Sequence, residues 1–307
     1  MLNISIIIPH YNSPYLLQKL LKSIPVMNDI EVLVIDDNSN EGLIEYDSLQ
    51  KEFGLVRFLS NNSSNKGAGA CRNIGMDKAT GKWVLFADAD DYYISGYYET
   101  IKPFFQSDYE VIFFRPTSID LRSGIISDRY KPYEERLLNY LNNGGQKDEL
   151  ELRYKLFSPW SKMIRRDILF KNKILFDEII VANDMMFSAK LGYHMEKFHV
   201  SQEAIYCVTS SAESLTQKND EKYFDIRVSV YIDYYKYLKE KLDKNQFNLV
   251  NVSGRDYIIR AIRNRYSFAK LMQIYLLFRK NKVKVFKFSD INIFKVIKVL
   301  KEEISRT

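Results

Sequence analysis

The sequence has few of the residues that build disulfide frameworks or soft-metal sites. Among its 307 residues, only two are cysteines and three are histidines. Cys71 and Cys207 stand far apart, which is not the spacing of a zinc site or of a disulfide-rich domain. We therefore expect two reduced cysteines that serve in packing, and histidines that are ordinary residues of a cytoplasmic protein.

Long apolar runs are also missing. Although 46% of the residues are hydrophobic, no run approaches the roughly 18 apolar residues that cross a bilayer. The N-terminal sequence MLNISIIIPHYN has no basic region, and its apolar run is only as long as a strand, so we expect no signal peptide. The composition predicts a cytoplasmic chain with enough apolar residues for a substantial core.

The positive charge is concentrated at one end of the chain. Residues 218–307 carry 21 Lys or Arg against 10 Asp or Glu, whereas residues 1–100 carry 8 against 13. A basic segment attracts polyanions and anionic membrane surfaces. This segment lacks the Gly-rich and aromatic–basic patterns of RNA-binding chains, so we expect no nucleic-acid partner.

Strand and helix patterns alternate through the first hundred residues. Buried-strand patterns occupy 4–8, 30–35, 55–59 and 82–87, and helical patterns occupy 13–24, 41–52 and 66–80. This alternation predicts an α/β fold with a doubly wound, mostly parallel sheet. Ligands bind such sheets outside the carboxyl ends of the strands, and the polar sequences HYN, DDNSN and DADD all follow predicted strands. The pattern indicates one ligand crevice at this edge of the sheet.

The rest of the chain is irregular and then helical. Residues 109–116 are predicted to form a strand, 183–193 a helix, and SPWSKMIRRDILFKN is predicted to enter a helix near Trp160. Residues 218–307 are predicted to form basic amphipathic helices, including one over 289–303 with a lysine stripe beside an apolar face. Such helices can lie in the headgroup layer of an anionic membrane, pack on the domain, or bind a second copy in a homo-oligomer. These alternatives stay open.

Three carboxylates crowd the end of the fourth predicted strand. Asp88, Asp90 and Asp91 lie within four residues, and like charges this close repel one another unless a positive charge is present. Oxygen ligands without His or Cys suit Mn²⁺ or Mg²⁺ rather than zinc or copper. The alternative is a solvated acidic turn, because Asp-x-Asp is a common sequence.

The order of four motifs narrows the choice. IIIPHYN, VLVIDDNS, NKGAGACRNIG and GKWVLFADADD follow one another over residues 4 to about 100, and together they resemble the family 2 nucleotide-sugar glycosyltransferases of bacterial surface-polysaccharide type. A weaker resemblance continues through SPWSKMIRRDILFKNKILFDEIIVANDMMFSAKL to AESLT at 212–216. The resemblance implies a GT-A domain over 1–217, with nucleotide-binding (1–100) and acceptor-binding (101–217) halves, before a helical region over 218–307.

The resemblance also implies roles for individual residues on the donor side. The base pocket would be lined by Pro9, Tyr11 and Asn12, and Asp37 would accept a hydrogen bond from the base, usually uracil. Lys66 and Arg72 would lie near the diphosphate, which a guanidinium can bind in a bidentate fork. Donor contact and metal ligation would be divided among the acidic residues, with Asp88 and Asp90 on the donor and Asp90 and Asp91 on Mn²⁺ or Mg²⁺.

On the acceptor side the resemblance implies a general base at Asp184 and acceptor contacts at Trp160 and Lys162. Asp184 could also be a helix N-cap, and the two roles are compatible. Trp160 could equally be a core residue. Two departures from the family pattern stand out. Asn183 precedes Asp184 where the family usually has Glu, and Ser210 and Ser211 stand where an arginine or histidine is common.

The expected function is transfer of a sugar, with inversion, from a nucleotide sugar to a glycan acceptor in a metal-dependent reaction. A UDP-sugar is the expected donor, and the acceptor is expected to be a glycan or lipid-linked glycan of a capsule, O-antigen or lipooligosaccharide. The expected location is the cytoplasm, peripheral to the inner face of the inner membrane. The alternative is a protein of the same fold that binds nucleotide sugars, or acts as a scaffold, without catalysis.

Overall fold

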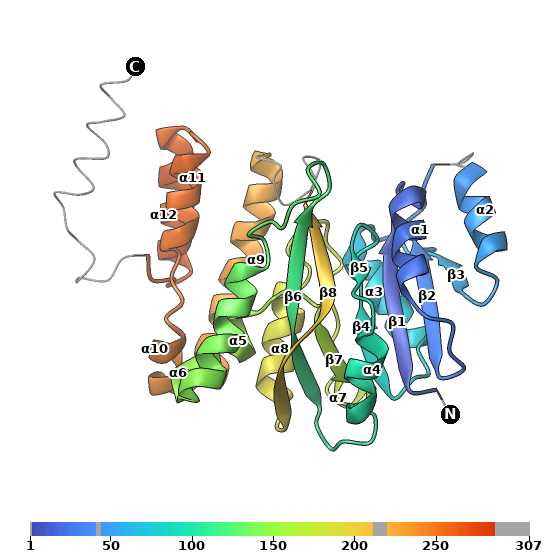
Figure 1. Cartoon of the computed structure of the whole chain (residues 1–307). Helices are drawn as coiled ribbons and strands as arrows, with labels where there is room; N and C mark the ends of the chain where they lie inside the picture. The colour runs from blue at the N-terminus through green and yellow to red at the C-terminus, as the bar shows by residue number, and fades with distance from the viewer. Residues whose placement is uncertain (1, 41–43, 211–219, 286–307) are drawn as a thin grey trace. The chain divides into compact units, whose positions relative to one another are not determined.

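The computed structural model describes residues 2–40, 44–210 and 220–285 (Figure 1). The chain divides into two compact units, Met1–Arg227 and Val228–Thr307. The predicted helix over 289–303 and the sequence AESLT at 212–216 lie outside the described residues.

Unit 1 is built on an eight-stranded sheet with the order β3-β2-β1-β4-β7-β6-β8-β5. The strands are β1 (Ile4–His10), β2 (Ile30–Asp36), β3 (Arg57–Ser60), β4 (Trp83–Phe86), β5 (Tyr92–Tyr93), β6 (Val111–Asp120), β7 (Lys162–Arg165) and β8 (Phe198–Ser210). The first four strands are parallel, as predicted, and β6 and β8 are parallel to each other. β7 and β5 run antiparallel to their neighbours, so the sheet is mixed. The predicted α/β class is confirmed.

Helices lie between these strands in the sequence and after the last of them. They are α1 (Pro14–Ser23), α2 (Ile44–Glu52), α3 (Ala68–Lys78), α4 (Tyr97–Ile101), the 3-10 turn η1 (Lys102–Phe104), α5 (Lys131–Asn143), α6 (Gln146–Lys155), α7 (Arg166–Lys171), α8 (Met185–His194) and α9 (Glu221–Lys241). Proline opens α1, and its buried side is Leu17, Leu20 and Leu21, which is the helical spacing seen in the sequence. The predicted helix near Trp160 was wrong in its first part, because Lys162–Arg165 form β7 and the helix begins only at Arg166.

The core of unit 1 lies around the central strands. The isoleucines of β1 and the tryptophan, valine, leucine and phenylalanine of β4 are all buried, as expected for parallel strands covered on both faces. Helix α3 packs very closely on β1, since a Cβ at Gly75 would lie 2.4 Å from Ile7 Cγ2. A larger residue at position 75 would push α3, and the residues it carries, away from the sheet.

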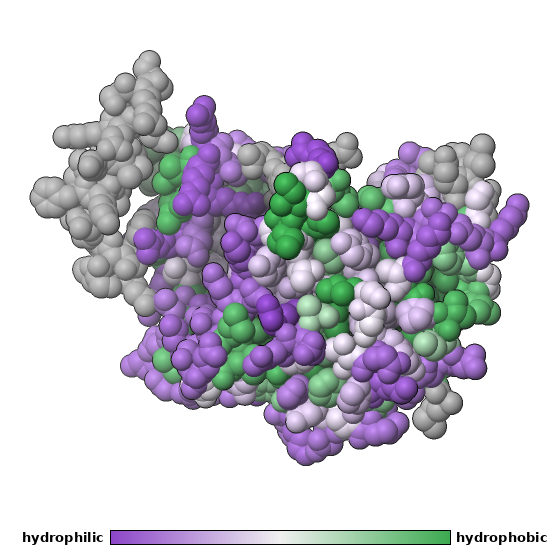
Figure 2. Space-filling model, in the orientation of Figure 1, coloured by the Kyte–Doolittle hydropathy of each residue, from purple (hydrophilic) through white to green (hydrophobic). Residues whose placement is uncertain are grey.

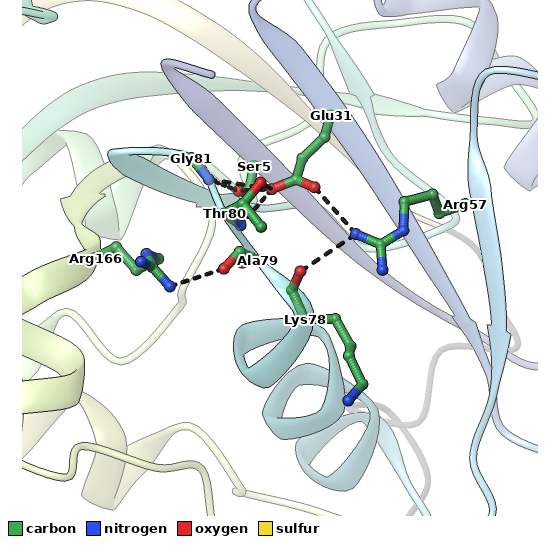
Figure 3. Close-up of polar contacts among 8 residues, drawn as sticks. All are labelled: Ser5, Glu31, Arg57, Lys78, Ala79, Thr80, Gly81 and Arg166. Carbon is green, nitrogen blue, oxygen red and sulfur yellow. Dashed lines mark hydrogen bonds and ion pairs between the residues drawn. The ribbon is translucent and has the colours of Figure 1, made fainter. Parts of the chain in front are cut away.

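The buried carboxylate of Glu31 joins the strands at the edge of the sheet where β1 and β2 begin (Figure 3). Glu31 Oε1 accepts hydrogen bonds from Ser5 Oγ at 2.6 Å, Thr80 N at 2.5 Å and Gly81 N at 3.1 Å. Its Oε2 lies 3.2 Å from an amine nitrogen of Arg57. Glu31 therefore connects β1, β2, β3 and the turn between α3 and β4. We call this set of contacts the Glu31 network.

Up to residue 285, the described part of unit 2 contains the rest of α9 and the helices α10 (Lys244–Val250), α11 (Arg255–Arg263) and α12 (Phe268–Lys280). Helix α10 begins with a capping box between Asp243 and Gln246. None of the helices in the described part of the chain is both long and apolar enough to span a bilayer.

Candidate functional site

The sheet topology gathers the predicted site residues at one edge. β4 is parallel to β1, and β7 runs antiparallel to both β4 and β6, so β1, β2, β4, β6 and β8 all end on the same side. β7 begins on that side, which brings Lys162 there from a distant part of the sequence. In Figure 1 the ends of β6 and β8 point the same way as the end of β1.

The first two strand ends are joined by a histidine and an aspartate. His10 Nδ1 lies 2.8 Å from Asp36 Oδ1, and the backbone N–H of Ser13 donates to His10 Nε2 at 3.2 Å. Because Nε2 accepts a hydrogen bond, the proton is on Nδ1 and the ring is neutral. Burial agrees with this, since it lowers the pKa of His10 although Asp36 acts to raise it. His10 and Asp36 thus hold the ends of β1 and β2 together.

The loop after β1 is fixed to the loop after β2. The N–H of Asn12 donates to Ser39 Oγ at 2.8 Å, and Asn12 Oδ1 accepts from Asn40 N at 2.9 Å. Asn12 has a φ of 49°, in the left-handed region that asparagine tolerates better than most residues. Tyr11 is 57% exposed beside it, and Pro9 is the last but one residue of β1. The predicted base-pocket loop thus has a defined shape and an exposed aromatic ring.

Asp37 connects the end of β2 to the turn that enters α3. Its Oδ2 accepts the backbone N–H of Gly67 at 2.7 Å, and its Oδ1 accepts from Asn61 Nδ2 at 2.7 Å. The Cys71 thiol also hydrogen-bonds this carboxylate. A carboxylate has about four lone-pair sites, so Asp37 could still accept an N–H of a base. Asp37 lies where the resemblance requires a base contact, and that role stays a prediction.

The Gly-rich sequence allows a second loop to lie directly on the start of α3. A Cβ at Gly69 would lie 2.1 Å from the carbonyl oxygen of Asp177, and Gly67 has a φ of +106°. Asn73, one turn further along α3, donates to Phe176 O at 3.0 Å and accepts from Phe176 N at 2.9 Å. These contacts hold residues 176–183 against α3. Lys66 is exposed just before this turn.

Arg72 joins three parts of the site. Its guanidinium donates to Asp88 Oδ1 at 2.6 Å and to Asn183 Oδ1 at 2.9 Å, and it lies 5.2 Å from the ring centre of Phe176. Arg72 is only 5% exposed. The structure therefore brings Arg72 together with the acidic turn, as expected for a diphosphate-side residue, but with two protein partners. Asn183, the departure from the family pattern, is one of them.

The acidic turn, residues 88–91 after β4, is bound to β8 by hydrogen bonds. Asp91 is 2% exposed, and its carboxylate accepts from the Tyr206 hydroxyl at 2.9 Å and from Thr209 N at 2.7 Å. The Tyr206 oxygen in turn accepts the N–H of Asp88 at 2.8 Å. Asp91 thus holds the turn in place, and its role as a metal ligand stays a prediction. Asp88 is more accessible, with 34% of its side chain exposed.

The carboxylates of this turn affect one another. Burial and the charge of Asp88 raise the pKa of Asp90 to about 6. Burial, Asp90 and Asp88 raise the pKa of Asp91 well above its usual range. Hard oxygen donors with unbalanced charge suit a divalent ion. In the described part of the chain, no group of three or more His, Cys, Asp or Glu could hold a metal by itself, and Mg²⁺ and its relatives typically complete their shell with substrate phosphates and water.

Asp184 stands at the start of α8 without capping it. It occupies the N-cap position, but its side chain makes no capping hydrogen bond. Burial raises the pKa of Asp184, Asp88 raises it further, and Arg72 and Lys162 lower it. These influences put Asp184 within electrostatic reach of the residues around the acidic turn. The predicted capping bond is not formed, and the role of Asp184 as a general base stays a prediction.

The two predicted acceptor residues are more enclosed. Lys162 is 2% exposed and donates to Leu156 O at 2.5 Å, and burial lowers its pKa to about 7 although Asp184 acts to raise it. Trp160 is 8% exposed and stacks with Tyr133 and Tyr206 at ring-centre distances of 5.1 and 5.9 Å. Trp160 packs as a core residue, which was one of its two interpretations, and acceptor contact stays a prediction for both residues.

Several site residues had no signal in the sequence analysis. Tyr206 and Thr209 hold the acidic turn, although they lie 115 and 118 residues from Asp91. Asn73 belongs to the sequence NKGAGACRNIG, and only its contact with Phe176 reveals its role. Ser210 ends β8, whereas Ser211 lies outside the described residues.

Comparisons with known proteins bear on the family and the fold of the chain. A glucosyltransferase of Campylobacter jejuni, named for a diNAcBac-PP-undecaprenol substrate, is 35% identical over 101 residues, which are 32% of this chain and 33% of that protein. The chain thus spans about a third of this relative's length. A solved structure of Staphylococcus aureus TarS 1–349 with UDP-GlcNAc has a TM-score of 0.61 at 21% identity, covering 85% of this chain and 73% of that one.

A second solved structure is the mannosyltransferase PcManGT of Pyrobaculum calidifontis with GDP-Man and Mn²⁺. Its TM-score is 0.56 at 13% identity, over 97% of this chain and 80% of that one. At such identities these likenesses show the GT-A fold. The family model for glycosyl transferase family 2 matches residues 5–172, more than half of the sequence. The chain therefore belongs to glycosyl transferase family 2.

Proposed function

We propose that this glycosyltransferase moves a sugar from a UDP-sugar to a glycan or lipid-linked glycan, with inversion and with the help of a divalent metal ion. The observation that carries the proposal is the meeting of Asp37, Asp88, Asp90 and Asp184 at one edge of one sheet. TarS with bound UDP-GlcNAc supports the kind of donor, and the undecaprenol-linked substrate in the name of the Campylobacter relative supports the kind of acceptor and a role in surface-glycan synthesis.

In the proposed reaction, Asp184 accepts the proton of an acceptor hydroxyl as its oxygen attacks the anomeric carbon. The bond from that carbon to the diphosphate breaks on the opposite face, so the configuration inverts. Asp90, with Asp91 or Asp88, would hold Mn²⁺ or Mg²⁺, which would offset the charge that develops on the departing diphosphate. Arg72 orients Asp88 from one side through their 2.6 Å ion pair.

Catalytic loss remains the second candidate because of Asn183. The hydrogen bond from Arg72 to Asn183 argues against it, since an amide oxygen can accept from the guanidinium as a carboxylate would. In addition, the carboxylate of Asp184 makes no capping hydrogen bond to α8, so it can accept a proton. Turnover of a UDP-sugar with a panel of glycan acceptors tests the proposal, and UDP binding without any turnover would favour the second candidate.

The metal proposal predicts a specific loss in the Asp90→Asn variant. Manganese is expected to raise the affinity of the wild-type protein for UDP. In the variant, the factor by which manganese raises this affinity is expected to be at least about tenfold smaller, because the charge of a metal ligand is removed. Calorimetric titration with and without Mn²⁺ measures it. Asp77→Asn, a change at a 69% exposed side chain on α3, is the control and should keep the metal response. Equal responses in both variants would contradict the metal site.

For location we propose the cytoplasmic face of a membrane with anionic lipids. Residues 255–285 carry nine Lys or Arg and one Asp. On α12, Phe268, Met272 and Leu276 are 78, 39 and 58% exposed at helical spacing, a pattern that can insert into a headgroup layer. These three residues, which we call the α12 ridge, could instead bind a second copy of the chain. Homo-oligomer formation is therefore the competing explanation for their exposure.

Vesicle flotation separates these explanations. Wild-type protein is expected to float with vesicles that contain anionic lipid, and the triple change of Phe268, Met272 and Leu276 to serine is expected to abolish flotation. Leu55→Ser, at a 79% exposed leucine of unit 1, is the control. A variant that floats normally but changes from oligomer to monomer in light scattering would assign the α12 ridge to subunit contact and reject the membrane proposal.

A further inference from the structure

The hairpin that follows β6 returns the chain to the acidic turn. Asp120 Oδ1 accepts the N–H groups of Arg122 and Ser123 at 3.0 and 2.9 Å, which closes the turn. Gly124 provides a φ of +69°. Ser127 N then donates to Ser118 O at 3.0 Å, so the returning segment is fixed alongside β6. Arg129 lies on this segment, next to the end of β8.

Arg129 contacts the residue on which the acidic turn rests. An amine group of its guanidinium donates to the carbonyl oxygen of Thr209. Thr209 in turn donates its N–H to Asp91 Oδ1 and its hydroxyl to the carbonyl oxygen of Asp90, each at 2.7 Å. Arg129 also acts to lower the pKa of Asp90, against burial and Asp88. The guanidinium is therefore close to the same carboxylates that define the site.

Arg72 and Arg129, the two arginines near this turn, differ in how many of their N–H groups are available to a ligand. Arg72 is 5% exposed and divides its guanidinium between Asp88 and Asn183. Arg129 is exposed, and its bond to Thr209 is its one hydrogen bond within the part of the chain that the structure describes. Its remaining N–H groups can donate to a ligand. Two adjacent N–H donors of a guanidinium match two oxygens of a phosphate group.

We propose that Arg129 binds the diphosphate of the nucleotide sugar, held by Thr209 at the end of β8 while its free N–H groups face the phosphate oxygens. The inference rests on the proposed function and adds a residue to it. As the bond from the anomeric carbon to the diphosphate breaks, the electron pair stays on the phosphate oxygen, and a fixed cation there stabilises the added charge. Arg129 takes up no proton in this step.

The test compares two ligands that differ in the phosphates. In the Arg129→Ala variant, UDP affinity is expected to fall by about 10- to 100-fold, because charge-assisted hydrogen bonds to phosphate are lost. Uridine, which has no phosphate, should bind the variant as it binds the wild type in the same competition assay. Arg129→Lys should recover part of the loss. Arg122→Ala, at an exposed arginine of the same hairpin, is the matched control and should change neither affinity.

Each contrary result has a distinct meaning. Unchanged UDP affinity in Arg129→Ala overturns the inference and leaves the proposed function standing. Equal losses for UDP and uridine also overturn it, since they indicate a site that has lost its shape. Wild-type protein that binds neither UDP nor a UDP-sugar rejects the proposed function, and the inference with it.

Discussion

Replacement of Asp184 by Asn is expected to reduce turnover by about 10²- to 10⁴-fold, the usual contribution of a general base, while the donor still binds. The amide keeps the size of the side chain but cannot accept the acceptor proton. Because Asp184 makes no capping bond, the variant should fold as the wild type does. Initial rates of UDP release and calorimetric UDP-sugar affinity measure the two effects separately.

A matched control is Asp167→Asn. Asp167 lies in the first turn of α7 and its side chain is 64% exposed, so its loss should leave turnover unchanged. A near-normal rate in Asp184→Asn would remove the base assignment. Loss of donor binding together with turnover would instead give Asp184 a binding role.

The pH dependence of the wild-type enzyme follows from the same carboxylate. Burial raises the pKa of Asp184, with a further increase from Asp88 and opposing decreases from Arg72 and Lys162. A base must be ionised to act, so the rate should fall as the pH drops through this raised pKa, above the range of an ordinary aspartate. A rate that stays constant down to the range of an exposed aspartate would argue against this base.

The largest effect on stability is expected from Glu31→Gln. The change removes the charge of a carboxylate whose Oε1 accepts four donated bonds, from Ser5, Thr80 and Gly81. If the amide oxygen keeps the Oε1 position, the NH2 group faces the Arg57 guanidinium, which is also a donor. Hydrogen bonds to a charged group contribute about 1.5 to 3 kcal/mol each, and the remaining oxygen recovers part of this, so we expect a loss of about 2 to 4 kcal/mol. Figure 3 shows how the donors converge on this carboxylate.

Urea unfolding followed by tryptophan fluorescence measures this loss. Trp83 and Trp160 are the only two tryptophans of the sequence, and both belong to unit 1, so the signal reports the unit that contains Glu31. Glu52→Gln is the control, since Glu52 is 41% exposed and pairs with Lys22 at 3.5 Å, and an exposed pair is worth less than about 1 kcal/mol. Equal midpoints for both variants would refute the role of the Glu31 network.

The sign of the pH effect gives a second readout. Burial acts to raise the pKa of Glu31, but the hydrogen bonds from Ser5, Thr80 and Gly81 outweigh it and lower the pKa overall. A lowered folded-state pKa means that the ionised group stabilises the fold above its unfolded pKa, and that this stability is lost as the pH falls through the folded value. Acidification from about pH 5 should therefore destabilise the wild type more than Glu31→Gln.

Much of the first hundred residues could be predicted because their signals are local. Buried runs without polar alternation mark parallel strands, and the leucine spacing marks α1. The polar sequence after each strand indicated the ligand edge, because parallel strands end on one side. Cys71 and Cys207 are buried free cysteines, as their scarcity suggested.

Other features could not be predicted because they depend on distant partners. The short strand Lys162–Arg165 looked helical, and it is a strand because it pairs with both β4 and β6. Trp160 suits either a sugar contact or the core by its sequence. The structure shows its stacking with Tyr133 and Tyr206, which are distant in the sequence, and its acceptor contact stays a prediction.

The sequence by itself determined the α/β class, the family resemblance and the acidic turn, since each depends on residues close together along the chain. The tertiary structure decided how the acidic residues differ in hydrogen-bond partners and exposure. Asp91 is turned to Tyr206 and Thr209, Asp88 pairs with Arg72, and Arg72 reaches Asn183 across 111 positions. The pKa of a carboxylate depends on how deeply it is buried and on which groups surround it. Both depend on residues that are distant in the sequence, so only the folded structure determines them.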